Sequence, residues 1–200
     1  MKTKIFKLLK IFLWISGVFA LSICFYLGYV FSKFNQDIDY EILNEVAKEI
    51  KKSKQLDARV LSMYDRVYDG ASKNSSIKHA WKKLWGKKIE CPCYMVTTRL
   101  PIHMNKRKKF TENSYAIATR LETKVSQMDC LNFLFEKFDY LYDAIGIEEA
   151  ARIYFKKPMN ELTDDELIGL IVMHENPSLF NPKRKKERFD KRVNEAKNKK

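Results

Sequence analysis

The chain begins with a long apolar run and continues as a series of amphipathic segments. From Ile11 to Ser32 the sequence holds twenty-two residues without a charge. A helix rises roughly 1.5 Å per residue, so this run is long enough to cross a hydrocarbon core of roughly 30 Å. Trp14 near one end, with Tyr26 and Tyr29 near the other, matches the preference of such rings for membrane interfaces. The run predicts a transmembrane helix, and a cleaved signal peptide is the alternative.

Charges on either side of this run indicate its orientation. Four lysines precede it, at Lys2, Lys4, Lys7 and Lys10, whereas acidic residues soon follow it. Because basic residues beside a span favour the cytoplasmic side, we expect residues 1–10 in the cytoplasm. The span then covers residues 11–32, and the chain from residue 33 onward lies outside.

Beyond the span, apolar positions recur at helical spacing. The first such segment carries Ile38, Ile42, Val46 and Ile50, each four residues after the last. Similar patterns predict helices over Leu56–Tyr68, Ile77–Trp85, Glu112–Val125, Met128–Ala144 and Ile147–Phe155. Gly is scarce at 6 and Pro at 5, and no run alternates with a period of two. The sequence therefore predicts a compact, mainly α-helical domain with irregular connections.

One helix boundary is marked by its capping residues. Thr163 can accept a hydrogen bond from the first helical turn, and Glu166 three residues later completes a capping box. An apolar run to Met173 follows, and Pro177 stops the helix.

The net charge of +13 favours anionic partners, and much of it lies at the end of the chain. Residues 183–200 hold ten basic and three acidic side chains, a net charge of +7. Two interpretations stay open: a solvated tail, or a segment attracted to an anionic membrane surface. Nucleic-acid binding is excluded, because no stacking motif or zinc finger accompanies the charge and the domain is expected outside the cytoplasm.

The cysteines predict a disulfide bond and no metal site. Outside the cytoplasm, either Cys91 or Cys93 can pair with Cys130. A closed zinc site needs about four ligands, and neither a second cysteine cluster nor a shared histidine spacing is present.

A family resemblance appears in the second half of the chain. From Cys130 to Lys157 the sequence reads CLNFLFEKFDYLYDAIGIEEAARIYFKK. Without a gap, it resembles the passage of family 51 peptidoglycan glycosyltransferases from I-L-E-x-Y-L-N through G-x-x-x-A-A-x-x-Y-F-G-K. The following stretch from Glu161 to Pro182 is similar to that family's D-L-T…A-P-S…N-P passage.

Upstream the resemblance is shorter and interrupted. The segment Val60–Tyr68 resembles the family's first motif, A-V-L-A-S-E-D-R-x-F. The segment Ile77–Leu84 resembles its I-x-R-A-L-x-x-N-L helix. The segment Tyr94–Leu100 stands at the place of S-T-I-T-Q-Q-L. Lys108–Glu112 resembles R-K-x-x-E.

The resemblance implies a lysozyme-like helical domain of the monofunctional type, without a transpeptidase domain. We expect a connector over residues 33–55, the glycosyltransferase-like domain over 56–182 and a basic tail over 183–200. It also implies a single-pass protein of the bacterial inner membrane, with its domain on the periplasmic or extracellular side. Lipid-linked peptidoglycan precursor, anionic lipid and cell-envelope proteins are the implied partners.

The positions of the family's two catalytic glutamates hold other residues. By the resemblance these are Tyr64 and Asn132; a phenol with a pKa of about 10 is a poor base, and an amide cannot ionise. Asp65 beside the first position and Glu136 one helical turn after the second are the substitute acids, with Asp69 and Glu90 as looser candidates. The leading hypothesis is a catalytically inactive module, and the alternative is an active polymerase with rearranged acids.

Residues that bind substrate in the family are better kept. The resemblance assigns this role to Thr97, Lys108, Lys109 and Glu112. The lysines are either a solvated charge run or a grip for a diphosphate or an anionic lipid. Trp81 and Trp85, with lysines around them, are either core residues or a membrane-dipping face. We expect no cofactor, with a divalent metal only if the domain is active.

Overall fold

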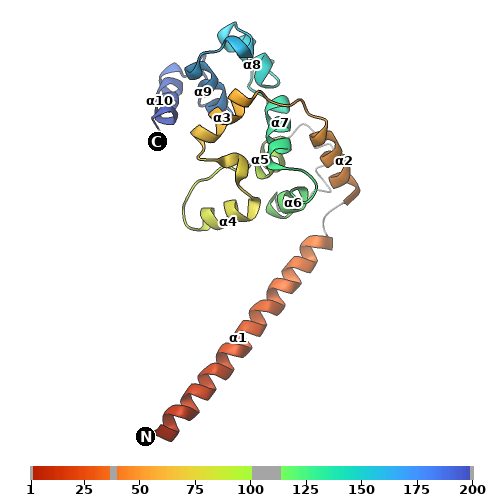
Figure 1. Ribbon diagram of the computed structural model, residues 1–200, viewed down its shortest axis with the longest axis vertical. Coiled ribbons are helices and arrows are strands. Elements are labelled where there is room, and N and C mark those ends of the chain that lie inside the picture. Colours follow the sequence, from red (N-terminus) through yellow and green to blue (C-terminus); the bar gives the residue numbers. More distant parts are fainter. Residues whose placement is uncertain (1, 37–39, 101–113, 199–200) are drawn as a thin grey trace. The chain divides into compact units, whose positions relative to one another are not determined.

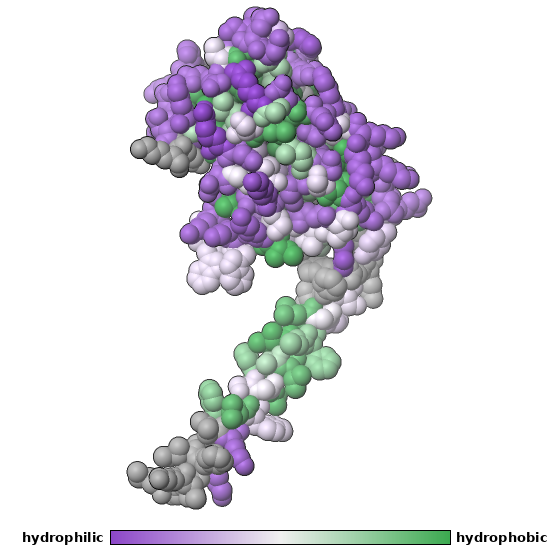
Figure 2. Space-filling view, in the orientation of Figure 1, coloured by the Kyte–Doolittle hydropathy of each residue, from purple (hydrophilic) through white to green (hydrophobic). Residues whose placement is uncertain are grey.

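The computed structural model describes residues 2–36, 40–100 and 114–198 (Figure 1). The chain divides into two units, residues 1–38 and 39–200. The first holds helix α1 (Lys2–Gln36). Within it, Lys10–Tyr29 is long and apolar enough to cross a membrane, with a mean hydropathy of 2.1. Figure 2 shows the apolar surface that this helix presents along its middle. Helix α1 is thus a candidate membrane span.

The second unit is built from short helices. They are α2 (Tyr40–Lys51), α3 (Ala58–Val67), α4 (Ser76–Leu84), α5 (Pro92–Arg99), α6 (Ser114–Leu121), α7 (Gln127–Lys137), α8 (Ile147–Phe155), α9 (Asp164–Met173) and α10 (Lys186–Lys197). Two 3₁₀ turns, η1 (Ala71–Lys73) and η3 (Met159–Glu161), lie between them. The described residues form no strand beyond an isolated bridge, so the predicted mainly α class is confirmed.

Helix α9 is at the centre of the core. Every residue from Leu167 to Met173 is buried, because α3, α8 and α10 all pack against it. A helix that is apolar on all sides is stable only when neighbours cover it. Its N-terminus has the predicted capping box, in which Thr163 and Glu166 each accept from the other's backbone N–H. Gly169 allows α10 to approach, since a Cβ there would lie 2.5 Å from the ring of Phe189.

A second layer forms around α5, which packs against α6 and α7. Helix α2 adds to it by burying Leu43 and Ile50, and it packs on α6 and α7. At the other end of the chain, α10 buries Phe189 and Val193 against α9. The compact unit therefore includes residues that the sequence analysis assigned to a connector and to a tail.

Helix α7 differs from its predicted range. It ends at Lys137, whereas the sequence pattern continued to Ala144. The chain from residue 138 turns instead, with positive φ angles at residues 141–143 and a bridge between Asp139 and Ile145. The carboxylate of Asp139 accepts the Leu141 N–H at 2.7 Å, which stabilises the turn over a longer helix.

Candidate functional site

Helix α3 places the residue at the family's first glutamate position inside the core. The side chain of Tyr64 is fully buried, and its hydroxyl has no hydrogen-bond partner among the described residues. Its ring lies 5.0 Å from that of Tyr68 and 5.8 Å from that of Phe135, measured between centroids. Burial, followed by the nearby charge of Glu90, raises the pKa of Tyr64 well above its usual value. A phenol in this environment stays protonated and out of reach of solvent.

The neighbouring acid, Asp65, is engaged in local structure. Its carboxylate accepts the backbone N–H of Ser72 at 2.8 Å and the Ser72 hydroxyl at 2.5 Å. These bonds hold the turn that carries the chain from α3 into η1, where Gly70 adopts a φ of 67°. Asp65 thus stabilises a turn.

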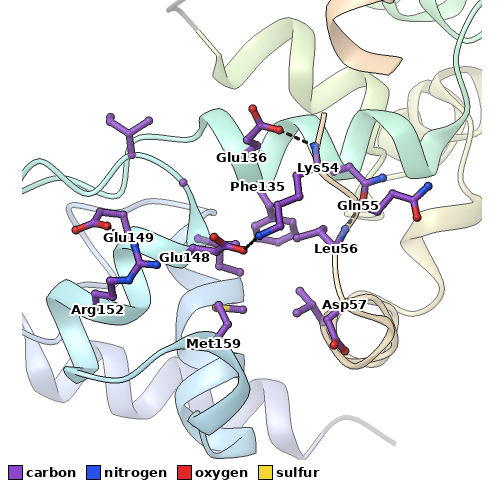
Figure 3. A pocket seen from close by; sticks show the side chains of 15 residues that line it. Lys54, Gln55, Leu56, Asp57, Phe135, Glu136, Glu148, Glu149, Arg152 and Met159 are labelled. Carbon is purple, nitrogen blue, oxygen red and sulfur yellow. Dashed lines mark hydrogen bonds and ion pairs between the residues drawn. The ribbon is translucent and has the colours of Figure 1, made fainter. Parts of the chain in front are cut away.

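The residue at the family's second glutamate position, Asn132, lies on α7, and its side chain binds the backbone of a neighbouring segment. Asn132 is 5% exposed, and its Oδ1 accepts the backbone N–H of Leu56 at 3.2 Å. One helical turn later, Glu136 accepts the backbone N–H of Lys54 at 2.8 Å. The two side chains share one face of α7, since residues four apart are neighbours on a helix. Together they fix the segment that leads into α3 along that face (Figure 3).

Glu136 also pairs with Lys137, at 2.5 Å from its ammonium group. Burial raises the pKa of Glu136, but the hydrogen bonds from Lys137 and from the Lys54 backbone outweigh it, so the net pKa is lowered. The carboxylate is therefore ionised and weakly basic, which is unfavourable for a general base.

A cavity of about 270 Å³ opens between this segment, the end of α7 and the start of α8 (Figure 3). Lys54 reaches across it to Glu148 at 2.5 Å, and Arg152 pairs with Glu149 at 2.9 Å. Four carboxylates line the cavity, and each accepts a hydrogen bond or forms an ion pair: Asp57, Glu136, Glu148 and Glu149. The cavity has polar walls, but each of these four carboxylates already has a hydrogen-bond or ion-pair partner.

The remaining sequence-predicted binding residues divide into two groups. Thr97 lies on α5, where its hydroxyl donates to the carbonyl oxygen of Tyr94 at 2.7 Å. The other three lie outside the described residues: Lys108, Lys109 and Glu112. Of the predicted set, the structure therefore places only Thr97, and it gives the hydroxyl a structural contact.

A partly buried network that the sequence did not reveal joins α5, α9 and the segment before α5. Arg99 donates to Nε2 of His174 at 3.0 Å and to its carbonyl oxygen at 3.2 Å. The same guanidinium lies 3.3 Å from the Glu90 carboxylate. Burial and the Arg99 charge hold the pKa of His174 well below its usual value, whereas burial raises the pKa of Glu90. No local spacing could have indicated this network, because Arg99 and His174 are 75 residues apart.

A disulfide bond joins helix α5 to helix α7. Cys93 at the start of α5 is bonded to Cys130 on α7. Of the two pairings that the sequence allowed, the structure contains the one through Cys93, and Cys91 is a buried free thiol. Burial, more than any other effect, raises the pKa of Cys91 to about 12, so it remains a thiol. Disulfides persist in oxidising compartments, which agrees with a domain outside the cytoplasm.

Among the described residues no cluster of His, Cys, Asp or Glu could hold a metal ion.

Comparison with known families decides the relationship. A family model for transglycosylases matches residues 95–199, which is more than half of the 200-residue chain. The chain belongs to the transglycosylase family. No curated protein matches the sequence. The match confirms the resemblance to glycosyltransferase family 51, and it runs from within α5 through α10, with Asn132 inside it. Tyr64 precedes the matched range, so its assignment rests on the Val60–Tyr68 motif.

Proposed function

We propose that this chain is a membrane-anchored, catalytically inactive member of the transglycosylase family, which binds lipid-linked peptidoglycan precursor or a cell-envelope protein. The observation that carries the proposal is the state of the two acid positions. Tyr64 is fully buried, and Asn132 uses its side-chain oxygen to hold the Leu56 backbone. Neither can take the proton from a sugar hydroxyl as the glycosidic bond forms.

The substitute acids support the same conclusion. Asp65 holds the turn at Ser72, and Glu136 holds Lys54. Recruiting either as a base would require it to give up these bonds. The position of the family's second glutamine holds Arg99, which is committed to His174 and Glu90.

The predicted topology supports a role at the envelope. The lysines before the span favour an N-terminus inside the inner membrane and a domain in the periplasm or outside the cell. The family's substrate is lipid-linked, so a candidate span such as α1 would keep the domain beside the membrane that holds it. No cofactor is needed for binding of this kind.

The deciding experiment is a polymerisation assay with the purified full chain and lipid-linked disaccharide precursor. We expect no glycan chains, with or without a divalent metal. We also expect labelled precursor to bind, and this binding to be lost in the Lys108→Ala/Lys109→Ala variant but kept in a matched Lys51→Ala/Lys52→Ala variant. Absence of precursor binding would leave a protein partner as the ligand.

The second candidate is an active polymerase, and one observation favours it. Glu90 is close enough to Tyr64 to raise the pKa of that phenol, and burial raises its own pKa toward the range of a general base. Glycan chains that disappear in Glu90→Gln, Asp65→Asn or Glu136→Gln would establish this alternative and overturn the proposal of an inactive domain.

A further inference from the structure

Helix α4 exposes an apolar face that the rest of the described domain leaves uncovered. Trp81 and Trp85 are 60% and 67% exposed, and their ring centroids lie 6.1 Å apart. Ile77 and Leu84 are also exposed. These four residues follow helical spacing and form one stripe, whereas the only buried residue of α4 is Ser76. The two tryptophans are therefore not core residues.

The turn after α4 brings lysines back to the same end of the helix. Gly86 adopts a φ of 69°, and the backbone N–H of Lys87 donates to the carbonyl oxygen of Lys82 at 2.9 Å. This left-handed residue reverses the chain immediately after Trp85. Lys87 and Lys88 follow, both are exposed, and neither forms an ion pair within the described part of the chain.

These lysines line a cavity of about 370 Å³ between the turn, α4 and α5. Its charged residues are Lys83, Lys87, Lys88, Arg99 and Glu90. Because Glu90 and Arg99 pair with each other at 3.3 Å, three lysine charges remain without a counter-ion in the cavity. Rings form part of the wall, with His79 and Tyr94 at a centroid distance of 4.5 Å.

We propose that this cavity binds the phosphate headgroup of an anionic phospholipid, while the α4 stripe enters the bilayer interface. A cationic cavity beside a tryptophan-bearing apolar stripe matches an amphiphile with an anionic head and an apolar body. Ligand pockets span about 300 to 1,000 Å³, so this volume suits a single headgroup better than a lipid-linked oligosaccharide. The proposal rests on described residues alone and does not depend on whether the domain polymerises glycan.

The test uses the full chain in lipid nanodiscs. The sequence contains 3 tryptophans, so Trp14→Phe leaves Trp81 and Trp85 as the two tryptophan reporters, which are excited selectively over tyrosine. Discs contain phospholipid brominated on its acyl chains, either as phosphatidylglycerol or, in equal amount, as phosphatidylcholine. We expect tryptophan quenching to be about twofold stronger in the anionic discs, and to fall to the neutral level in Lys87→Gln/Lys88→Gln.

Control variants separate the headgroup site from general attraction. Lys51→Gln/Lys52→Gln removes two exposed lysines elsewhere in the domain, and it should leave quenching in anionic discs unchanged. Thermal unfolding of each variant verifies that it is folded. Equal quenching in neutral and anionic discs, or equal losses in the two lysine pairs, would overturn the proposal. So would quenching that appears only when a polyprenyl diphosphate is added, because it would identify the lipid-linked diphosphate as the ligand.

Discussion

At the scale of single residues, two tyrosines show how helix α3 packs into the core. Tyr64 and Tyr68 lie one helical turn apart on α3, and both are buried beside His174. Their hydroxyls differ: that of Tyr68 donates to Glu175 at 2.8 Å, whereas that of Tyr64 has no partner in the part of the chain that the structure describes. A buried polar group without a partner destabilises the folded state, which makes the pair a direct test of the packing around the first acid position.

We expect Tyr64→Phe to raise the free energy of unfolding by about 1 kcal/mol, because it removes an unsatisfied buried hydroxyl. In contrast, Tyr68→Phe should lower it by about 2 kcal/mol, because Glu175 loses a donor. Chemical denaturation of the full chain in detergent measures both. A loss of stability in Tyr64→Phe equal to that in Tyr68→Phe would show that the Tyr64 hydroxyl has a partner.

Gly146 falls on a glycine of the family motif, and a glycine at this position has a steric reason in this chain. Its φ is 84°, and a Cβ would lie 2.6 Å from the backbone oxygen of Glu136. We expect Gly146→Ala to destabilise the fold by roughly 3 kcal/mol, from backbone strain and overpacking together. Gly86→Ala has a similar φ but open space around it, so thermal unfolding should show a smaller loss there.

At the scale of elements, the helices are joined by contacts between residues far apart in the sequence, which local sequence patterns do not predict. The Lys54–Leu56 segment lies on α7 because Asn132 and Glu136 bind its amides. Helix α5 is bonded to α7 through Cys93 and Cys130. These contacts join α7 to the segment before α3 and to α5, so we expect the packing in this region to resist reorganisation.

Loss of the disulfide should be costly. Closing a loop over a sequence separation of 37 residues stabilises by about 4 kcal/mol in the chain-entropy account. We expect Cys93→Ala/Cys130→Ala to lower the unfolding free energy by about that amount and to make it insensitive to reductant. Cys91→Ala, in contrast, should keep the reductant sensitivity. Labelling the unfolded, unreduced chain should detect two thiols, Cys24 and Cys91; four labelled thiols would contradict the bond.

At the scale of the whole molecule, buried ionisable groups link stability to pH. His174 accepts from Arg99, so it must remain neutral in the fold, and its pKa is held well below the usual value. Below about pH 6.5 the unfolded chain binds a proton at this residue that the folded chain does not. Stability therefore falls as the pH is lowered. Glu90 acts in the opposite direction, since burial raises its pKa and favours folding at acid pH.

In the chain that carries His174, we expect the free energy of unfolding to fall by about 1.4 kcal/mol for each pH unit below about 6.5. The comparison is with His174→Phe, which keeps an aromatic ring among Tyr64, Phe135 and Phe138 but cannot titrate. Because Glu90 is present in both proteins, its own titration contributes to both stability curves. Parallel stability curves from pH 7 to pH 5 would show that His174 is not the titrating group.

The sequence alone determined the features that depend on neighbouring residues. Periodicity predicted the helices, as in α8 over Ile147–Phe155, and the capping box at Thr163 marked the start of α9. The apolar run indicated the candidate span, and the gapless motif around Asn132 revealed the family and the missing glutamate. Each is readable because helix propensity, capping and hydropathy act over a few residues.

Tertiary structure decided what depends on distant residues. It selected Cys93 over Cys91 for the disulfide and placed Tyr64 in the core. It also ended α7 early, where the turn before Gly146 passes close to the Glu136 backbone. The Arg99–His174 contact spans 75 residues, and burial and pairing across such separations arise only once α5, α7 and α9 pack together. The sequence shows which acids are absent, and packing shows that the residues in their place support the fold.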